Sequence, residues 1–400
     1  LTGLSVSATL LFAGLGTLLF HFLSRGEVPA FLGSSFAVIA GYAAIAPTGE
    51  AELLPYACLG VACAGLLYPV LAALFRAFGA KRVMRFFPPV VTGPIVISIG
   101  LILASSAIAN CQTNWLVAVV AVAVIVVCNI WGRGMVKIVP ILLGVVVSYA
   151  VAAALGEVDF SGVAAAPWVG LPIVWDNTVF ALFGPQFDSG LATTAIITIM
   201  PLAFATMIEH IGDISAIGST CERNYIADPG LHRTLLGDGF ATILASLFGA
   251  PANTTYGENT GVLVLSNVHD PRVIRIAACF AIILGFIPKM ADIIGSMPSA
   301  IVGGVSFILY GMISAIGVRN IVENQVDFTK SRNLIIAAVI LVCGLGFSSG
   351  LTFHVAGTSV TLTGLAIAAL AGIILNAILP GNDYEFGANP EGDQNRGIHA

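Results

Sequence analysis

Charged residues are scarce in this chain of 400 residues: they make up 9% of it, whereas hydrophobic residues make up 58%. A soluble domain carries about 25% charged residues, so a water-facing surface of the usual kind is excluded. The stretches 115–131 and 334–346 contain no charged residue at all. A bilayer core requires roughly 20 apolar residues per helical span. Such stretches recur along the whole length and predict an all-α, polytopic membrane protein.

Motifs for metal or covalent chemistry are also missing. Seven cysteines are scattered without a CxxC pair, and most lie in apolar stretches, where cysteine packs as a small hydrophobe. HExxH does not occur, and no GxSxG follows a strand pattern. We therefore expect neither an enzyme nor a cofactor or metal site, and no nucleic-acid partner.

Hydropathy and breaker residues predict thirteen membrane segments. They cover residues 5–23, 29–46, 53–78, 87–109, 115–131, 137–155, 191–215, 232–249, 255–267, 271–289, 298–317, 331–348 and 359–379. If the first segment begins outside, 15 of the 16 Lys and Arg residues fall in inside loops or the tail, and Lys289 alone falls outside. This distribution follows the positive-inside rule and places the C-terminus in the cytoplasm.

The segments indicate an internal repeat. An odd count with an outside start is typical of a chain that lacks the first of fourteen helices, and seven plus seven gives an inverted repeat. PPVVTG (88–93) and PSAIVG (298–303) each open a segment. The stretches 29–41 and 251–266 both begin Pro-Ala and carry glycine and hydroxyl residues where a helix should run. Interrupted segments in matching halves point to a transporter site.

Three carboxylates fall at membrane depth: Glu209, Asp213 and Glu258. Each costs ~2.5–3.5 kcal/mol at the centre of a span, so such groups usually mark an ion or substrate path, although a structural contact between helices is the alternative. Glu209 and Asp213 share one helix face, and two close carboxylates favour retention of a proton, as proton-coupled transport requires. We interpret His210 as a packing or helix-contact residue, and Asp238 as a helix-start or interface residue near the inner end of its span.

The stretch around Glu258 suits a planar ligand. Gly257 lets a ligand approach the backbone and leaves N–H groups available, and Tyr256 offers a ring face. Residues 33–36 supply a second set of N–H groups on the mirrored segment. Carboxylates accept from ligand N–H groups and backbone N–H groups donate to ligand carbonyls. Nucleobases fit this description, although amino acids also bind at broken helices.

These residues resemble the nucleobase–ascorbate transporter family, and within it the bacterial uracil permease branch. The family signature reads here Glu258-Asn259-Thr260-Gly261, four residues, then Ser266. Similar stretches extend the resemblance over essentially the whole chain: FLGSSFA (31–37), DPGLHR (228–233), NTTYGEN (253–259) and GGVSFILYG (303–311).

The resemblance implies fourteen helices in two domains, with short extended pieces in the two broken segments. The core domain would comprise residues 1–79 and 191–290, the gate domain 87–156 and 298–379, and the cytoplasmic tail 380–400. It implies proton-coupled import of uracil across the cytoplasmic (inner) membrane by an elevator-like movement, and a possible homodimer.

The resemblance also implies site residues. Glu209 and Glu258 would bind the base, Phe36 and Gly257 would lend backbone N–H groups, and Tyr256 and Tyr310 would line the pocket. Proton coupling would involve Asp213, Glu209 and Glu258, whereas Asn259, Gly261 and Ser266 belong to the signature.

Two departures keep the substrate open. Asp213 stands where one uracil permease pattern has His and where purine-transporting relatives commonly have Asp. Glu258 is instead the choice typical of pyrimidine carriers. Xanthine or urate is therefore the alternative substrate. An ion channel, which predicts rings of like residues, is a weaker alternative outside transport.

Overall fold

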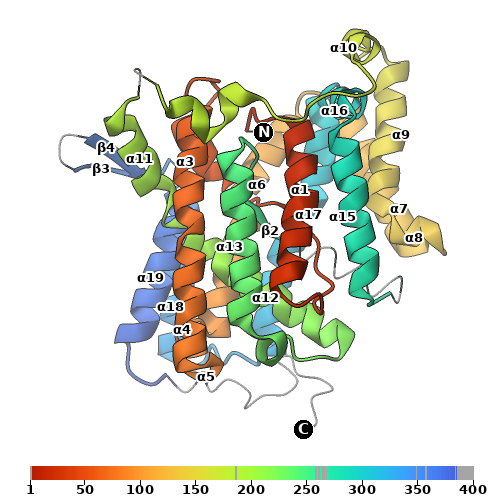
Figure 1. Cartoon of the computed structure of the whole chain (residues 1–400). Coiled ribbons are helices and arrows are strands. Elements are labelled where there is room, and N and C mark those ends of the chain that lie inside the picture. Colours follow the sequence, from red (N-terminus) through yellow and green to blue (C-terminus); the bar gives the residue numbers. More distant parts are fainter. Residues whose placement is uncertain are drawn as a thin grey trace.

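The computed structural model of the chain describes residues 2–184, 187–256, 259, 262, 263, 266, 268–347, 349–355, 358–382 and 384. Its helices run side by side through the molecule (Figure 1). Within the described residues, five helices are long and apolar enough to cross a membrane. A sixth candidate is the pair α15 (Pro271–Gly285) and α16 (Pro288–Gly295), which is bent by 86°.

The elements fall into two series joined by a long connection. The first contains α1 (Val6–Leu23), β1 (Leu32–Ser34), α2 (Ile39–Ile45), α3 (Leu54–Gly65), α4 (Leu67–Phe78), α5 (Ala80–Val83), η1 (Met84–Phe86), α6 (Pro89–Cys111), α7 (Trp115–Trp131), α8 (Met135–Ile138) and α9 (Pro140–Ala154). The connection contains α10 (Ser161–Ala165), η2 (Trp175–Asn177) and η3 (Val179–Leu182). The second series contains α11 (Ser189–Ile199), α12 (Leu202–Cys221), η4 (Ile226–Gly230), α13 (Leu231–Leu247), β2 (Asn253–Thr255), α15 (Pro271–Gly285), α16 (Pro288–Gly295), α17 (Ser299–Glu323), α18 (Ser331–Gly346), β3 (Leu351–Val355), β4 (Thr358–Leu362) and α19 (Gly364–Ile378).

The packing of the two series is mirrored. Helix α1 packs against α13 and α15, and α13 packs against α1, α3 and α4. Helix α6 packs against α17 and α18, and α17 packs against α6 and α7, while α7–α9 and α18–α19 form equivalent pairs. The same set of helix pairs results when each helix is exchanged for its counterpart in the other series. The counterparts are α1 and α13, α3–α4 and α15, α6 and α17, α7 and α18, and α9 and α19. The predicted repeat is therefore visible in the packing.

The repeat is inverted, as the α6–α17 interface demonstrates. A Cβ at Gly93, near the start of α6, would lie 3.1 Å from the carbonyl oxygen of Gly317, near the end of α17. A Cβ at Gly303, near the start of α17, would lie 2.6 Å from the backbone nitrogen of Cys111, where α6 ends. The two helices are thus antiparallel, and glycine at these positions lets their backbones approach closely.

Two of the predicted segments differ in detail from the structure. The segment 191–215 is divided at Met200–Pro201 into α11 and α12, because proline removes an N–H donor from the helix ladder. The predicted helix 359–379 is wrong at its start, since residues up to Leu362 form the antiparallel hairpin β3–β4. The segment 255–267 lies largely outside the described residues.

Contacts between loops agree with the predicted sidedness. Arg25 lies 3.9 Å from Asp228, and Arg223 lies 3.6 Å from Glu27, so two loops predicted to lie inside meet. Lys289, the lone basic residue predicted outside, donates from Nζ to carbonyl oxygens of the α10 region at 3.0 Å. Helices α10 and α16 lie at the end of the molecule opposite α5 (Figure 1).

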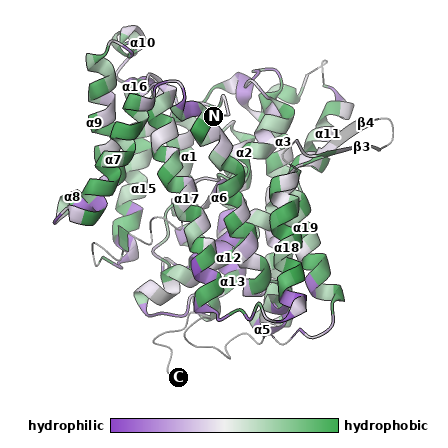
Figure 2. Ribbon diagram, turned by 180° about the vertical axis from the view of Figure 1, so that it is seen from behind, coloured by the Kyte–Doolittle hydropathy of each residue, from purple (hydrophilic) through white to green (hydrophobic). Residues whose placement is uncertain are grey.

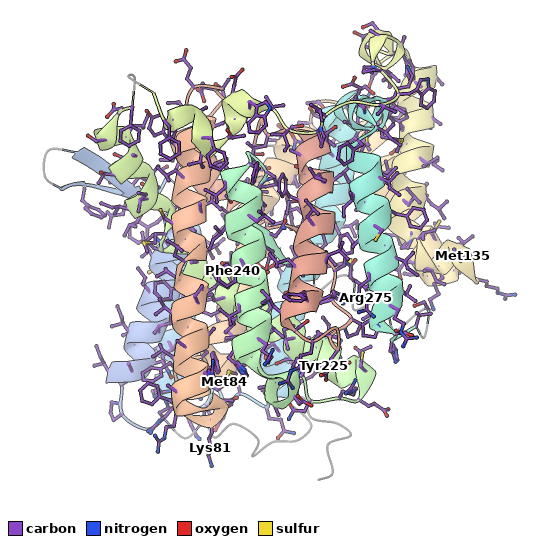
Figure 3. The ribbon with its side chains drawn as sticks, viewed as in Figure 1. Lys81, Met84, Met135, Tyr225, Phe240 and Arg275 are labelled. Atoms are coloured by element: carbon purple, nitrogen blue, oxygen red, sulfur yellow. The ribbon has the colours of Figure 1, made fainter. Side chains whose placement is uncertain are left out.

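Apolar residues cover the flanks of the outer helices, and hydrophilic residues gather at the ends of helices and around α12 (Figure 2). Lys81 and Arg275 lie toward the same end of the molecule (Figure 3). This is the distribution of a protein whose middle zone faces lipid, because charged side chains are costly in the hydrocarbon core.

Candidate functional site

Two short strands meet at the centre of the molecule. Strands β1 and β2 pair antiparallel, with Leu32 opposite Thr255 and Ser34 opposite Asn253. Each follows a proline of a Pro-Ala pair, which disfavours helix at that point. Gly33 is required here, because a Cβ at this position would lie 2.4 Å from the ring of Tyr256. The extended pieces predicted in the two broken segments are confirmed.

Each strand is fixed to a helix of the repeat. The hydroxyl of Thr17 in α1 accepts a hydrogen bond from the backbone N–H of Leu32 at 2.9 Å. The hydroxyl of Thr242 in α13 donates to the carbonyl oxygen of Asn253 at 2.6 Å. The Asn253 amide in turn donates to the carbonyl oxygen of Phe12 at 2.8 Å. The strand pair is therefore held from both halves.

Three aromatic residues gather beside the strands. The rings of Phe36 and Tyr256 are stacked with centroids 6.3 Å apart, and Phe36 meets Tyr310 of α17 edge to face at 5.4 Å. The Tyr256 hydroxyl donates to the carbonyl oxygen of Ser34 at 3.0 Å, which fixes the ring. The backbone N–H of Phe36 donates to no acceptor within the described residues. Three of the predicted binding residues are thus brought together from distant parts of the chain.

The carboxylates of α12 lie next to strand β2. Asp213 is 6% exposed, and its Oδ2 accepts a hydrogen bond from the hydroxyl of Thr255 at 2.9 Å. Glu209 is half-buried, one turn earlier on the same helix. Gly257, Glu258 and Gly261 lie outside the described residues. Asp213 is therefore linked by one hydroxyl group to the strand that leads into the signature.

Two further signature residues have local contacts. The backbone N–H of Asn259 donates to the carbonyl oxygen of Tyr256 at 3.1 Å. The hydroxyl of Ser266 donates to the carbonyl oxygen of Val262, four residues earlier, at 2.7 Å.

Comparison with a protein-family model identifies the family to which the chain belongs. Residues 2–353 match the xanthine/uracil permease model, which is described as "Permease family". The chain belongs to this family of nucleobase–ascorbate transporters. Members of the family are permeases, so the expectation that the chain is not an enzyme is confirmed.

Named relatives are similar over nearly the whole chain. The chain is 40% identical over 390 residues to a uracil permease of Bacillus caldolyticus, covering 95% of this chain and 87% of that protein. It is 40% identical to a uracil permease of Bacillus subtilis (strain 168), covering 95% and 88%. It is 36% identical to a uracil permease of Escherichia coli (strain K12), covering 93% and 84%.

Solved structures confirm the fold class. The transmembrane domain of the cyanobacterial bicarbonate transporter BicA aligns with a TM-score of 0.60 at 15% identity, covering 94% of this chain and 96% of that one. The murine anion transporter Slc26a9 aligns with a TM-score of 0.58 at 13% identity, covering 94% and 66%. At this level of identity the likeness concerns the fold alone, an inverted-repeat transporter of the seven-plus-seven type.

Sequence reasoning missed one pair beside the permease site. Asp238 lies in the middle of α13 rather than at its inner end, and its Oδ2 is 3.3 Å from Nδ1 of His210. Both side chains are fully buried. The pair is a contact between α12 and α13, which agrees with His210 as a helix-contact residue and Asp238 as an interface residue. The alternative interpretation of Asp238 as a helix-start residue was wrong, because the residue lies in the middle of α13. A carboxylate between two glycines inside an apolar span was the available signal.

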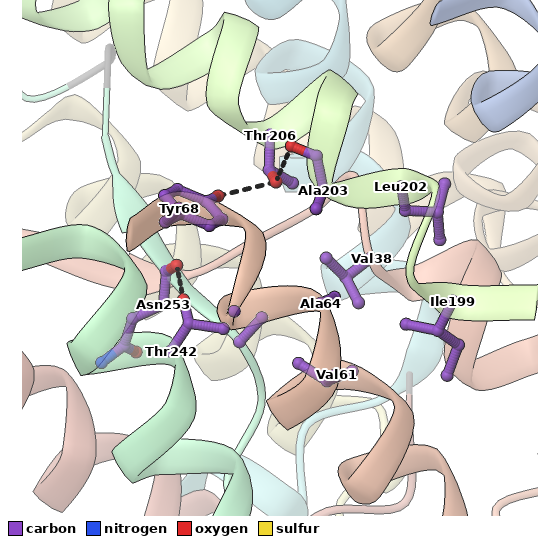
Figure 4. A pocket seen from close by; sticks show the side chains of 12 residues that line it. Val38, Val61, Ala64, Tyr68, Ile199, Leu202, Ala203, Thr206, Thr242 and Asn253 are labelled. Carbon is purple, nitrogen blue, oxygen red and sulfur yellow. Dashed lines mark hydrogen bonds between the residues drawn. The ribbon is translucent and has the colours of Figure 1, made fainter. Parts of the chain in front are cut away.

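A small cavity lies behind the strands. It is lined by side chains from α3, α4, α11, α12 and α13, including Tyr68, whose hydroxyl donates to Thr206 at 2.7 Å (Figure 4). Its accessible volume of about 10 Å³ is room for roughly one water molecule. This cavity is therefore too small to hold a nucleobase.

Proposed function

We propose that this permease is a proton-coupled symporter that imports uracil across the cytoplasmic membrane. The observation that carries the proposal is the meeting of Phe36, Tyr256 and Tyr310 beside strand β2, whose Thr255 is hydrogen-bonded to Asp213 of α12. The names of relatives at 36–40% identity, all uracil permeases, support the choice of uracil.

The recognition chemistry follows from the groups present. Aromatic faces stack on a planar base. Glu209 and Glu258 would accept from the ring N–H groups of uracil, since an ionised carboxylate only accepts. The backbone N–H groups of Phe36 and Gly257 would donate to its carbonyl oxygens. Each polar edge of the base then has a partner, which a buried ligand requires.

We propose the same two domains for the movement. The core, residues 1–79 and 191–290, carries the strands and the carboxylates. The gate, residues 87–156 and 298–379, contributes Tyr310 and contacts the core where α12 packs against α6 and α19. In an elevator-like step the core would carry the base past the gate, and the tail, residues 380–400, would lie in the cytoplasm. In a homodimer, the two gate domains would stay fixed while the core domains move.

Uptake into proteoliposomes tests the proposal. We expect labelled uracil to accumulate when an inward proton gradient is imposed, and unlabelled uracil to compete better than xanthine, urate or thymine. Collapse of the gradient should stop accumulation. Uptake of xanthine without uracil would overturn the pyrimidine assignment, and dependence on sodium would overturn the coupling ion.

A further inference from the structure

The buried pair His210–Asp238 takes no part in the recognition of a base described above. Its Nδ1–Oδ2 distance is 3.3 Å and both side chains are 0% exposed. The ring of Phe20 in α1 meets the His210 ring edge to face, with centroids 6.2 Å apart. A buried ionisable pair is costly to desolvate, and removal of one partner costs still more. Such a pair therefore calls for an explanation.

Thr255 connects this pair to Asp213. Its Oγ1 donates to Oδ2 of Asp213 at 2.9 Å and lies 3.3 Å from Nδ1 of His210. A hydroxyl group has one hydrogen, so a hydroxyl that donates to Asp213 can only accept from His210. The hydrogen bonds therefore have one direction: His210 donates to Thr255, and Thr255 donates to Asp213.

We propose that His210 and Asp238 are positioning residues that, through Thr255, determine how Asp213 holds the transported proton. The inference rests on the proposed proton coupling and adds three residues to it. Helix α12 carries both His210 and Asp213, and Thr255 ends the strand next to Tyr256. A change in the direction of these hydrogen bonds would thus affect groups that lie beside the bound substrate.

The protons balance in the following scheme. Before uptake, Asp213 is ionised and accepts from the hydroxyl of Thr255, and Thr255 accepts from Nδ1–H of His210. Asp238, 3.3 Å from the same nitrogen, keeps the His210 ring in position. After one proton binds to Asp213, its carboxyl group donates to Thr255, so the hydroxyl of Thr255 must turn its hydrogen away from Asp213. One proton has entered and the charge of Asp213 changes from −1 to zero.

Two other titratable side chains lie near the pair, and neither changes its protonation state in this scheme. They are Glu209, which precedes His210 on α12, and Tyr68 on α4, which faces Asp238. Helix α1 contributes the apolar ring of Phe20. Neutralisation of a buried negative charge favours movement through an apolar zone, because an ionised group is far more costly to desolvate.

A pair of adjacent threonines allows a matched test. Thr254 and Thr255 are each 1% exposed, but the hydroxyl of Thr254 has no hydrogen-bond partner within the described residues. Thr255→Val removes the link, Thr255→Ser keeps it, and Thr254→Val is the control. Two activities are measured in proteoliposomes: uracil accumulation driven by a proton gradient, and uracil exchange at equal concentrations without a gradient.

We expect Thr255→Val to lose at least about tenfold in gradient-driven accumulation while exchange stays within about twofold of wild type. Thr255→Ser should restore accumulation, and Thr254→Val should behave as wild type in both assays. Asp238→Asn, which keeps the size of the side chain, should show the same split and tests the inference if Thr255→Val does not fold.

Two results would overturn the inference. One is wild-type accumulation in Thr255→Val or in Asp238→Asn. The other is an equal loss of accumulation and exchange in both variants, which would indicate a structural role. A wild-type protein that exchanges uracil but never accumulates it would instead overturn the proposed proton coupling itself, and this inference with it.

Discussion

The two halves of the repeat share a scaffold but differ in chemistry. In both, a threonine of the strand-bearing helix holds a strand: Thr17 in α1 holds β1, and Thr242 in α13 holds β2. The second half adds the buried Asp213, His210 and Asp238. Among the described residues of the first half, no Asp or Glu is buried. The first half supplies backbone and aromatic surface instead.

We propose that the two halves have separate tasks. An inverted repeat allows one structure to open toward either side of a membrane, because each half can adopt the arrangement of the other. Proton coupling needs no such symmetry, and a second set of carboxylates would add desolvation cost without adding a coupled proton. We infer that the scaffold serves alternating access and that the second half alone serves coupling.

The largest effect is expected from removal of a carboxylate in the second half. Glu258→Gln replaces an ionised acceptor by a neutral amide with one acceptor oxygen and an NH2 group that only donates, so the N–H group of uracil loses a charged acceptor. We expect binding to weaken by at least about 100-fold, since loss of a buried charged hydrogen bond costs ~2–5 kcal/mol. Uracil binding by the purified variant measures this. Glu52→Gln in an outer loop is the control, and unchanged affinity in Glu258→Gln would remove Glu258 from the site.

A smaller loss of uracil affinity is expected from a substitution in the first half. Gly33→Ala would place a Cβ 2.4 Å from the Tyr256 ring, so the ring must move away from Phe36. We expect uracil affinity to fall about tenfold, or ~1.4 kcal/mol, because a stacking face is displaced while the carboxylates stay in place. The number of protons moved per uracil should not change. Gly295→Ala, where a Cβ would meet nothing within 4 Å, controls for expression. A changed proton stoichiometry would contradict the division of tasks.

Local patterns could predict the spans and the broken segments, because hydropathy, proline and glycine act within a few residues. The stacking of Phe36 on Tyr256 and the His210–Asp238 pair could not be predicted from such patterns. They depend on how α12 and α13 are rotated against each other and against β1, which is set by packing across distant parts of the chain. The hairpin β3–β4 was missed for a different reason. Its apolar and β-branched residues (LTFHV, TSVTL) fit a strand as well as the start of a membrane helix.

The smallest effect compares the two threonine anchors directly. Thr17→Val leaves the backbone N–H of Leu32 without its acceptor, whereas Thr242→Val removes a donor from the carbonyl oxygen of Asn253. A buried N–H group tolerates the loss of its partner less well than a carbonyl group does. We therefore expect Thr17→Val to cost about 1–2 kcal/mol of stability and Thr242→Val about half as much.

Thermal unfolding of the purified variants in detergent measures how much each threonine anchor contributes to stability. Thr198→Val is the matched control. The hydroxyl of Thr198 is buried and has no hydrogen-bond partner within the described part of the chain, so its removal should leave Tm nearly unchanged. Equal losses at the two anchors would mean that the scaffold is more symmetric than the hydrogen bonds indicate. A larger loss for Thr242→Val would mean that β2, the strand of the coupling half, depends more on its helix than β1 does.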